Sequence, residues 1–92
     1  MGLFFNDAPK RVSKEEFKKV RAALASEGMQ KIEIDKVEEI FLGDIYETTD
    51  SQKGVDRKEL EARIKWMREN MSKHRLSEKD VSLVEEKMSR YL

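Results

Sequence analysis

The chain has 92 residues, of which 41% are charged and 38% apolar, and its 19 basic and 19 acidic residues give a formal net charge of +0. This composition excludes a membrane-embedded protein, a collagen-like chain and a strongly basic nucleic-acid coat, and the length allows one small domain. The absence of cysteine excludes disulfides and thiolate chemistry, and we expect a soluble, cytoplasmic protein.

Residues 1–12 are expected to form an apolar N-terminal arm. The arm contains Leu3, Phe4 and Phe5, and Pro9 follows them at a position where it interrupts no predicted helix. The apolar run is shorter than a secretory signal or a membrane span requires. We therefore expect these three side chains to contact either the rest of the fold or a partner protein. Membrane contact is not expected, because so short an apolar patch binds lipid weakly.

Residues 13–92 are predicted to form a single all-α domain of four helices, each opened by an N-terminal capping signal. A Ser or Asp followed three residues later by an acidic residue predicts a helix start, because both side chains satisfy unpaired amides of the first turn. The signals are Ser13-x-x-Glu16, Asp35-x-x-Glu38, Asp56-x-x-Glu59 and Ser77-x-x-Asp80. Together with helical apolar periodicity, they predict helices over about 13–26, 35–46, 56–72 and 77–91.

The apolar stripes of these helices define the expected core. Its members are Phe17, Val20, Leu24, Val37, Ile40, Phe41, Ile45, Leu60, Ile64, Met67, Met71, Val81, Val84, Met88 and Leu92. Three residues that precede capping signals, Val12, Val55 and Leu76, are typical of hydrophobic staples. Between the first two helices, Ile32-Glu33-Ile34 alternates as a short extended segment would, and residues 47–54 form a polar, turn-rich connection.

Two of the helix starts resemble the second half of the calcium-binding loop of the EF-hand family. In Val12-Ser13-x-x-Glu16-Phe17 and Val55-Asp56-x-x-Glu59-Leu60, an apolar and an acidic residue stand where that loop has its central hydrophobic and final acidic residues. The resemblance implies an EF-hand-like packing of four helices without metal as an alternative to a compact bundle. The capping and staple pattern explains the two segments equally well.

Calcium binding itself is not expected, because the first half of the loop does not match. Placing Ile34 or Leu76 at the central position leaves unsuitable residues where oxygen ligands and a glycine belong: Met29, Lys31 and Ile32, or Met71, Lys73 and His74. In the stretch from Asp50 to Glu61, Gly54 comes one place too early. Calcium requires six or more oxygen ligands, so we expect neither a metal nor another cofactor.

Catalytic motifs are absent from the sequence. It contains no Gly-rich phosphate loop and no His-Glu-x-x-His helix, and no serine, histidine and acidic arrangement can be recognised. His74, the single histidine, is expected in an exposed turn before the last helix. A small bundle also offers little volume for a substrate pocket. We therefore expect a protein that is not an enzyme.

The charges are unevenly distributed along the chain. Residues 1–21 and 57–75 are basic on balance, whereas residues 27–50 are acidic. The simplest expectation is that these segments neutralise one another within the fold. The alternative is that a basic face is available to an acidic partner.

Trp66 lies off the apolar stripe of its helix, on a face that it shares with Ala62, Asn70 and Lys73. It either covers a second core face or anchors a partner protein, as exposed aromatic residues often do. With Leu3, Phe4 and Phe5, these residues are the candidate partner-binding set. The predicted function is a non-catalytic protein-interaction module, with self-association included.

The alternative function is association with nucleic acid through the basic face of the third predicted helix. Arg63 and Lys73 could contact phosphates there while Trp66 stacks on a base. The net charge of +0 and the acidic residues of 27–50 oppose this interpretation, because they would repel a nucleic-acid backbone.

Overall fold

The structure, a computed structural model, describes residues 10–45 and 54–92 and is built from helices. The described residues form α1 (Lys14–Ser26), α2 (Lys31–Ile45), α3 (Arg57–Glu69), α4 (Met71–His74) and α5 (Glu78–Ser89). The predicted all-α class is therefore confirmed. Residues 1–9 of the N-terminal arm, with Leu3, Phe4 and Phe5, and most of the predicted 47–54 connection lie outside the described residues.

Three of the four predicted capping signals open helices as expected. Reciprocal hydrogen bonds join Ser13 with Glu16 before α1, Asp56 with Glu59 before α3, and Ser77 with Asp80 before α5. In the first of these, the amide of Glu16 donates to the Ser13 hydroxyl over 3.0 Å, and the amide of Ser13 donates to the Glu16 carboxylate over 2.9 Å. These starts are fixed locally, because each pair satisfies amides that have no partner within the helix.

The predicted start of α2 is wrong by one turn. The helix begins at Lys31, so Ile32-Glu33-Ile34 is helical and not extended. The amide of Gln30 donates to the Glu33 carboxylate over 2.9 Å at this start. Asp35 lies inside the helix and accepts hydrogen bonds from Arg21 over 2.7 Å and from Lys31 over 2.9 Å. Its carboxylate therefore binds cations instead of capping the backbone.

The third predicted helix, over 56–72, is divided into α3 and the single turn α4. The division is at Asn70, whose φ of −129° and ψ of 37° depart from helical values. The Asn70 side-chain amide donates to the carbonyl of Trp66 over 2.8 Å. After α4, Arg75 adopts a left-handed conformation with φ of 61°, which turns the chain into α5. The described residues thus contain five helices instead of the four predicted.

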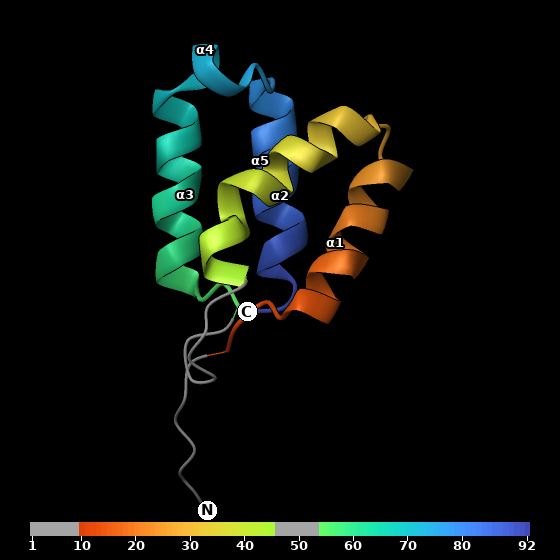
Figure 1. The fold of residues 1–92 in the computed structure, drawn as a ribbon, viewed down its shortest axis with the longest axis vertical. Helices are drawn as coiled ribbons and strands as arrows, with labels where there is room; N and C mark the ends of the chain where they lie inside the picture. Colours follow the sequence, from red (N-terminus) through yellow and green to blue (C-terminus); the bar gives the residue numbers. More distant parts are fainter. Residues whose placement is uncertain (1–9, 46–53) are drawn as a thin grey trace, which may run out of the picture.

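α3 and α5 lie side by side and α4 connects them at one end, while α2 runs obliquely past α5 and ends beside α3 in Figure 1. α1 packs against α5 and α2, and α2 also contacts α3. Among residues 10–45 and 54–92, the core between these helices contains 17 buried apolar residues: Val12, Phe17, Val20, Leu24, Met29, Ile34, Val37, Phe41, Ile45, Val55, Leu60, Ile64, Met67, Leu76, Val81, Val84 and Met88.

Twelve of these 17 were predicted from the helical stripes. The predicted Ile40, Met71 and Leu92 are only partly buried and pack against the core. The three staple residues are also in the core, which explains why an apolar residue precedes each of these caps. None of the described helices has the length and apolar character that crossing a lipid bilayer would require.

A short backbone pairing joins the residues that precede α1 and α3. The amide of Val12 donates to the carbonyl of Val55 over 2.8 Å, and the amide of Val55 donates back to the carbonyl of Val12 over 3.0 Å. Both valines are fully buried. The antiparallel contact thus connects the same two segments that resemble the second half of the EF-hand loop.

Candidate interaction surface around Trp66

The side chain of Trp66 lies largely outside the core. Trp66 is 40% exposed, whereas Ile64 and Met67 on the same helix are 2% and 0% exposed. Of the two roles considered for Trp66 from the sequence, a second core face would require its burial. The observed exposure leaves much of the indole accessible at the surface between α2 and α3.

Two adjoining hollows surround the indole, and we refer to them together as the Trp66 groove. The larger has a volume of about 170 Å³ and lies between α2, α3 and α4. The smaller has a volume of about 100 Å³, and Ile40 and Trp66 line both hollows. The described residues that line the groove are Lys36, Glu39, Ile40, Arg63, Trp66, Lys73 and His74.

The imidazole of His74 forms one wall of the groove. The prediction that His74 is exposed was wrong. His74 is only 6% exposed. Its Nδ1 accepts a hydrogen bond from the amide of Leu76 over 3.0 Å, and its Nε2 lies 2.6 Å from the carbonyl of Met67. An accepting Nδ1 requires a neutral ring with its proton on Nε2, which then donates to Met67.

This arrangement gives His74 a structural role at the end of the α3–α4 segment. The two main-chain groups that it binds are the amide of Leu76 and the carbonyl of Met67, and the imidazole supplies a hydrogen-bond partner to each. The rings of His74 and Trp66 have centroids 6.0 Å apart and are tilted by 41°. His74 therefore links the conformation of the α4–α5 turn to one side of the groove.

The rim of the groove is predominantly basic. It carries Lys36 from α2, Arg63 from α3 and Lys73 from α4, whereas Glu39 is the single acidic lining residue among those the structure describes. The ammonium group of Lys36 donates to the carbonyl of His74 over 3.2 Å, which holds it beside the groove. The groove thus combines an apolar floor with positive charge from three different helices.

Part of this surface consists of residues that were predicted from the sequence to bind a partner. Lys73 lines the groove as part of α4, and Asn70 is half-buried and holds the backbone of Trp66. Ala62 is exposed on α3 but does not line either hollow. Leu3, Phe4 and Phe5 lie outside the described residues.

The contribution of α2 to the groove was missed. Ile40 was assigned to the core, and Lys36, Glu39 and His74 were not considered part of a site. The available signal was the position of Ile40 at the edge of the α2 stripe, since at 100° per residue it is displaced from Phe41 and Val37 toward Lys36. That displacement indicates that Ile40 lies at the edge of the apolar stripe of α2. It cannot indicate which helix packs beside that edge.

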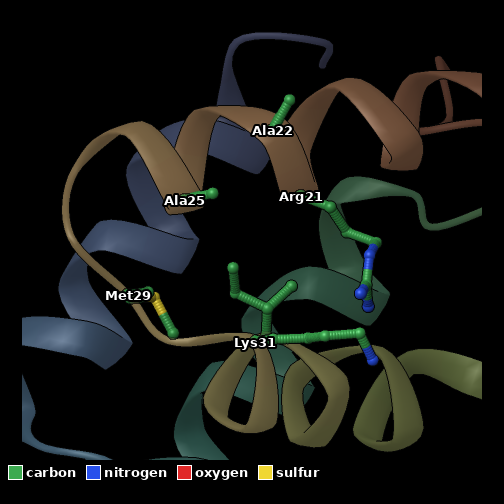
Figure 2. Close-up of a pocket in the computed structure, with 6 residues that line it drawn as sticks. Arg21, Ala22, Ala25, Met29 and Lys31 are labelled. Atoms are coloured by element: carbon green, nitrogen blue, oxygen red, sulfur yellow. The ribbon is translucent and has the colours of Figure 1, made fainter.

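Outside the Trp66 groove, a separate hollow of about 300 Å³ lies between α1 and α2 (Figure 2). Ala22, Ala25, Met29 and Ile34 supply apolar lining, and the charged lining residues are Arg21 and Lys31. Both cations are engaged with acidic residues of α2, because Arg21 contacts Asp35 and Glu38 over 2.7 Å each and Lys31 contacts Asp35 over 2.9 Å. This hollow therefore has little unpaired charge to offer a ligand.

The Arg21 network shifts the pKa values of two of its members in favour of their charged forms. The hydrogen bond from Arg21, followed by that from Lys31, lowers the pKa of the Asp35 carboxyl below its usual value. The hydrogen bond to Asp35 is also the main cause that raises the pKa of Arg21, against a smaller opposing effect of burial. These contacts join the basic α1 to the acidic α2, as expected for segments that neutralise each other.

The residues described contain no group of three or more His, Asp or Glu side chains placed to hold a metal ion. In the same part of the chain, every buried side-chain nitrogen or oxygen has a hydrogen-bond partner. The Trp66 groove is thus defined by exposed apolar and basic contacts and not by a buried polar site. Comparisons with protein-family models, with curated proteins and with solved structures find no match for this chain.

Proposed function

We propose that this protein is a non-catalytic interaction module that binds a segment of a partner protein in the Trp66 groove. The observation that carries the proposal is the 40% exposure of Trp66 beside the partly buried Ile40. Aromatic residues with an apolar body and a polar edge are the side chains that most often dominate binding at protein interfaces.

The size of the groove supports a protein segment as its ligand. Its two hollows, of about 170 Å³ and 100 Å³, are each smaller than the roughly 300–1,000 Å³ typical of small-molecule sites. They suit individual side chains that project from a peptide. A second copy of the chain is one source of such a segment, and sedimentation equilibrium across a range of concentrations measures that contribution.

A peptide-display selection on the full-length protein tests this function. Selected sequences are synthesised without tryptophan, and their binding is followed by the fluorescence of Trp66, the single tryptophan of the chain. We expect Trp66→Ala to lower the affinity for the selected peptides, measured by calorimetry, about tenfold or more, since a central aromatic anchor contributes about 2 kcal/mol or more. Ile32→Ala is the matched control, because Ile32 is 64% exposed but lines neither hollow of the groove.

Stability measurements separate a binding role from a core role. Because part of the Trp66 surface is covered, we expect Trp66→Ala to lower the free energy of unfolding by about 1–2 kcal/mol, less than the loss of a core residue. The fully buried Phe41 is the reference, and Phe41→Ala should lower it by about 3–5 kcal/mol. Equal losses in the two variants, or selected peptides that bind wild type and Trp66→Ala alike, would refute the proposed function.

Association with nucleic acid is the second candidate, because Lys36, Arg63 and Lys73 surround an exposed aromatic ring. Its test is titration of labelled single-stranded DNA and RNA at low and moderate salt. Binding that collapses with salt, and with Arg63→Gln and Lys73→Gln, would support it. Binding that is absent at low salt excludes it.

A further inference from the structure

We infer that the ligand of the Trp66 groove is an acidic peptide segment that carries bulky apolar side chains. This inference rests on the proposed function and names the chemistry of the partner. It is carried by the charge around the groove, by the shape of its floor and by the acidic residues that lie to one side.

Within the described part of the chain, two lysines of the groove, like other exposed lysines such as Lys65, lack the carboxylate partners that several arginines of the fold have. The guanidinium groups of Arg11, Arg21 and Arg68 each contact two carboxylates. Within residues 10–45 and 54–92, by contrast, no carboxylate forms an ion pair with Lys36 or Lys73. In a chain whose formal net charge is +0, two lysines without carboxylate partners on one groove are a local excess of positive charge. A ligand with negative charge would complement them.

The floor of the groove requires more than charge from its ligand. Ile40 and Trp66 line both hollows, and the indole also faces the buried ring of His74. Covering this apolar surface is favourable in proportion to the area removed from water. An acidic segment that also carries neighbouring aliphatic or aromatic side chains can fill the two hollows while its carboxylates reach the rim.

The acidic residues of α2 favour a peptide over a nucleic acid. Glu39 lines the groove, and with Asp35, Glu38 and Leu42 it also lines a further hollow of about 310 Å³ on α2. Asp35 and Glu38 are paired with Arg21, so Glu39 is the carboxylate that the regularly spaced negative charges of a nucleic-acid backbone would meet on a path across α2. A peptide can place its acidic side chains over Lys36 and Lys73 alone.

The composition of the selected peptides is the first test. Peptides that depend on Trp66 should be enriched in Asp and Glu together with large apolar residues. Replacing the acids of such a peptide by Asn and Gln should weaken binding about tenfold or more at about 50 mM salt, and raising the salt to about 500 mM should remove most of that difference.

A pair of charge-reversal variants is the second test. Lys73→Glu should lower the affinity for an acidic peptide about three- to tenfold, because it replaces an attractive contact by a repulsive one. Lys65→Glu changes the net charge equally at an exposed position of α3 that lines neither hollow, and it should weaken binding less than about twofold. A peptide with Lys in place of its acids should show the opposite preference and bind Lys73→Glu better than wild type.

The outcomes distinguish this inference from the proposed function. Trp66-dependent peptides that are neutral or basic would overturn the inference and leave the proposed function standing, as would equal effects of Lys73→Glu and Lys65→Glu. A selection that yields no Trp66-dependent peptide would refute both. An oligothymidylate of about 20 nucleotides that displaces the peptide at moderate salt would also overturn both, in favour of nucleic-acid binding.

Discussion

At the scale of single residues, His74 combines a buried ring with two main-chain hydrogen bonds. Removing the ring leaves the amide of Leu76 and the carbonyl of Met67 without these partners inside the fold. We expect His74→Ala to lower the free energy of unfolding by about 1–3 kcal/mol, the cost of one unsatisfied buried group, because the amide of Leu76 loses its partner while the carbonyl of Met67 still accepts from the amide of Asn70 over 3.3 Å. Urea denaturation at neutral pH measures the loss.

Two further observations check that His74 acts through the end of α3 and α4. Ser72→Ala, at an exposed position of α4, should leave stability within about 0.5 kcal/mol of wild type. The fluorescence of Trp66 should change in His74→Ala, because the two rings are neighbours. A His74→Ala protein that is as stable as Ser72→Ala would contradict the assigned hydrogen bonds.

Asp35 gives stability a defined dependence on pH. Its pKa is lowered in the folded chain by hydrogen bonds from Arg21 and then Lys31. The unfolded chain therefore binds more protons than the folded chain at acidic pH, so this contribution is complete above the ordinary carboxyl pKa of about 4 and is lost as the pH falls through the lowered value. We expect Asp35→Asn to be less stable than wild type at pH 7, with the difference shrinking as the pH falls below about 4 and through the lowered pKa.

Denaturant unfolding at several pH values measures this difference. Glu69→Gln is the control, because Glu69 is exposed and forms no ion pair among the described residues. A difference between Asp35→Asn and wild type that persists unchanged at acidic pH would show that Asp35 stabilises the helix by another route. The raised pKa of Arg21 has no effect in this range, because its contribution is lost only at strongly alkaline pH.

At the scale of elements, a helix start was predictable where its signal was purely local. The boxes at Ser13, Asp56 and Ser77 involve residues three apart, so their spacing in the sequence is also their spacing in space. Asp35 and Glu38 have the same spacing, but a guanidinium 14 and 17 residues earlier binds both. A capping pattern cannot reveal such a distant competitor, and the start of α2 was therefore misplaced.

The same distinction separates the predictable and unpredictable parts of the candidate site. The departure of Trp66 from the stripe of α3 follows from helical periodicity, and its exposure in the structure agrees with that departure. The opposite wall, made by Ile40 and Lys36, depends on how α2 packs beside α3. The burial of His74 depends on the break at Asn70, which no strong helix-breaking residue marks.

At the scale of the whole molecule, the Val12–Val55 pairing holds the starts of α1 and α3 together across 43 residues of sequence. Gly54 lies directly beside it, and Arg11 reaches over the same point to Asp56 and Glu59. α1 and α3 are also joined through α5, which packs against both. The backbone pairing holds α1 and α3 together at one end, and α5 holds them together along their lengths.

Gly54 and Gly28 provide a matched test of this pairing. Both adopt positive φ, +96° and +101°, which side chains rarely accept, so an alanine is strained at either position by about 1–2 kcal/mol. At Gly54 the added Cβ would also lie 2.6 Å from the carbonyl oxygen of Val12, whereas nothing lies within 4 Å at Gly28. Because that oxygen accepts from Val55, the clash must displace the pairing.

We therefore expect Gly54→Ala to lose at least about 1 kcal/mol more unfolding free energy than Gly28→Ala, which is the net contribution of one hydrogen bond. Hydrogen exchange should localise the difference, with faster exchange of the Val12 and Val55 amides in Gly54→Ala only. Equal losses in the two variants, with both amides still protected, would show that the pairing does not hold α1 and α3 together and that α5 alone does so.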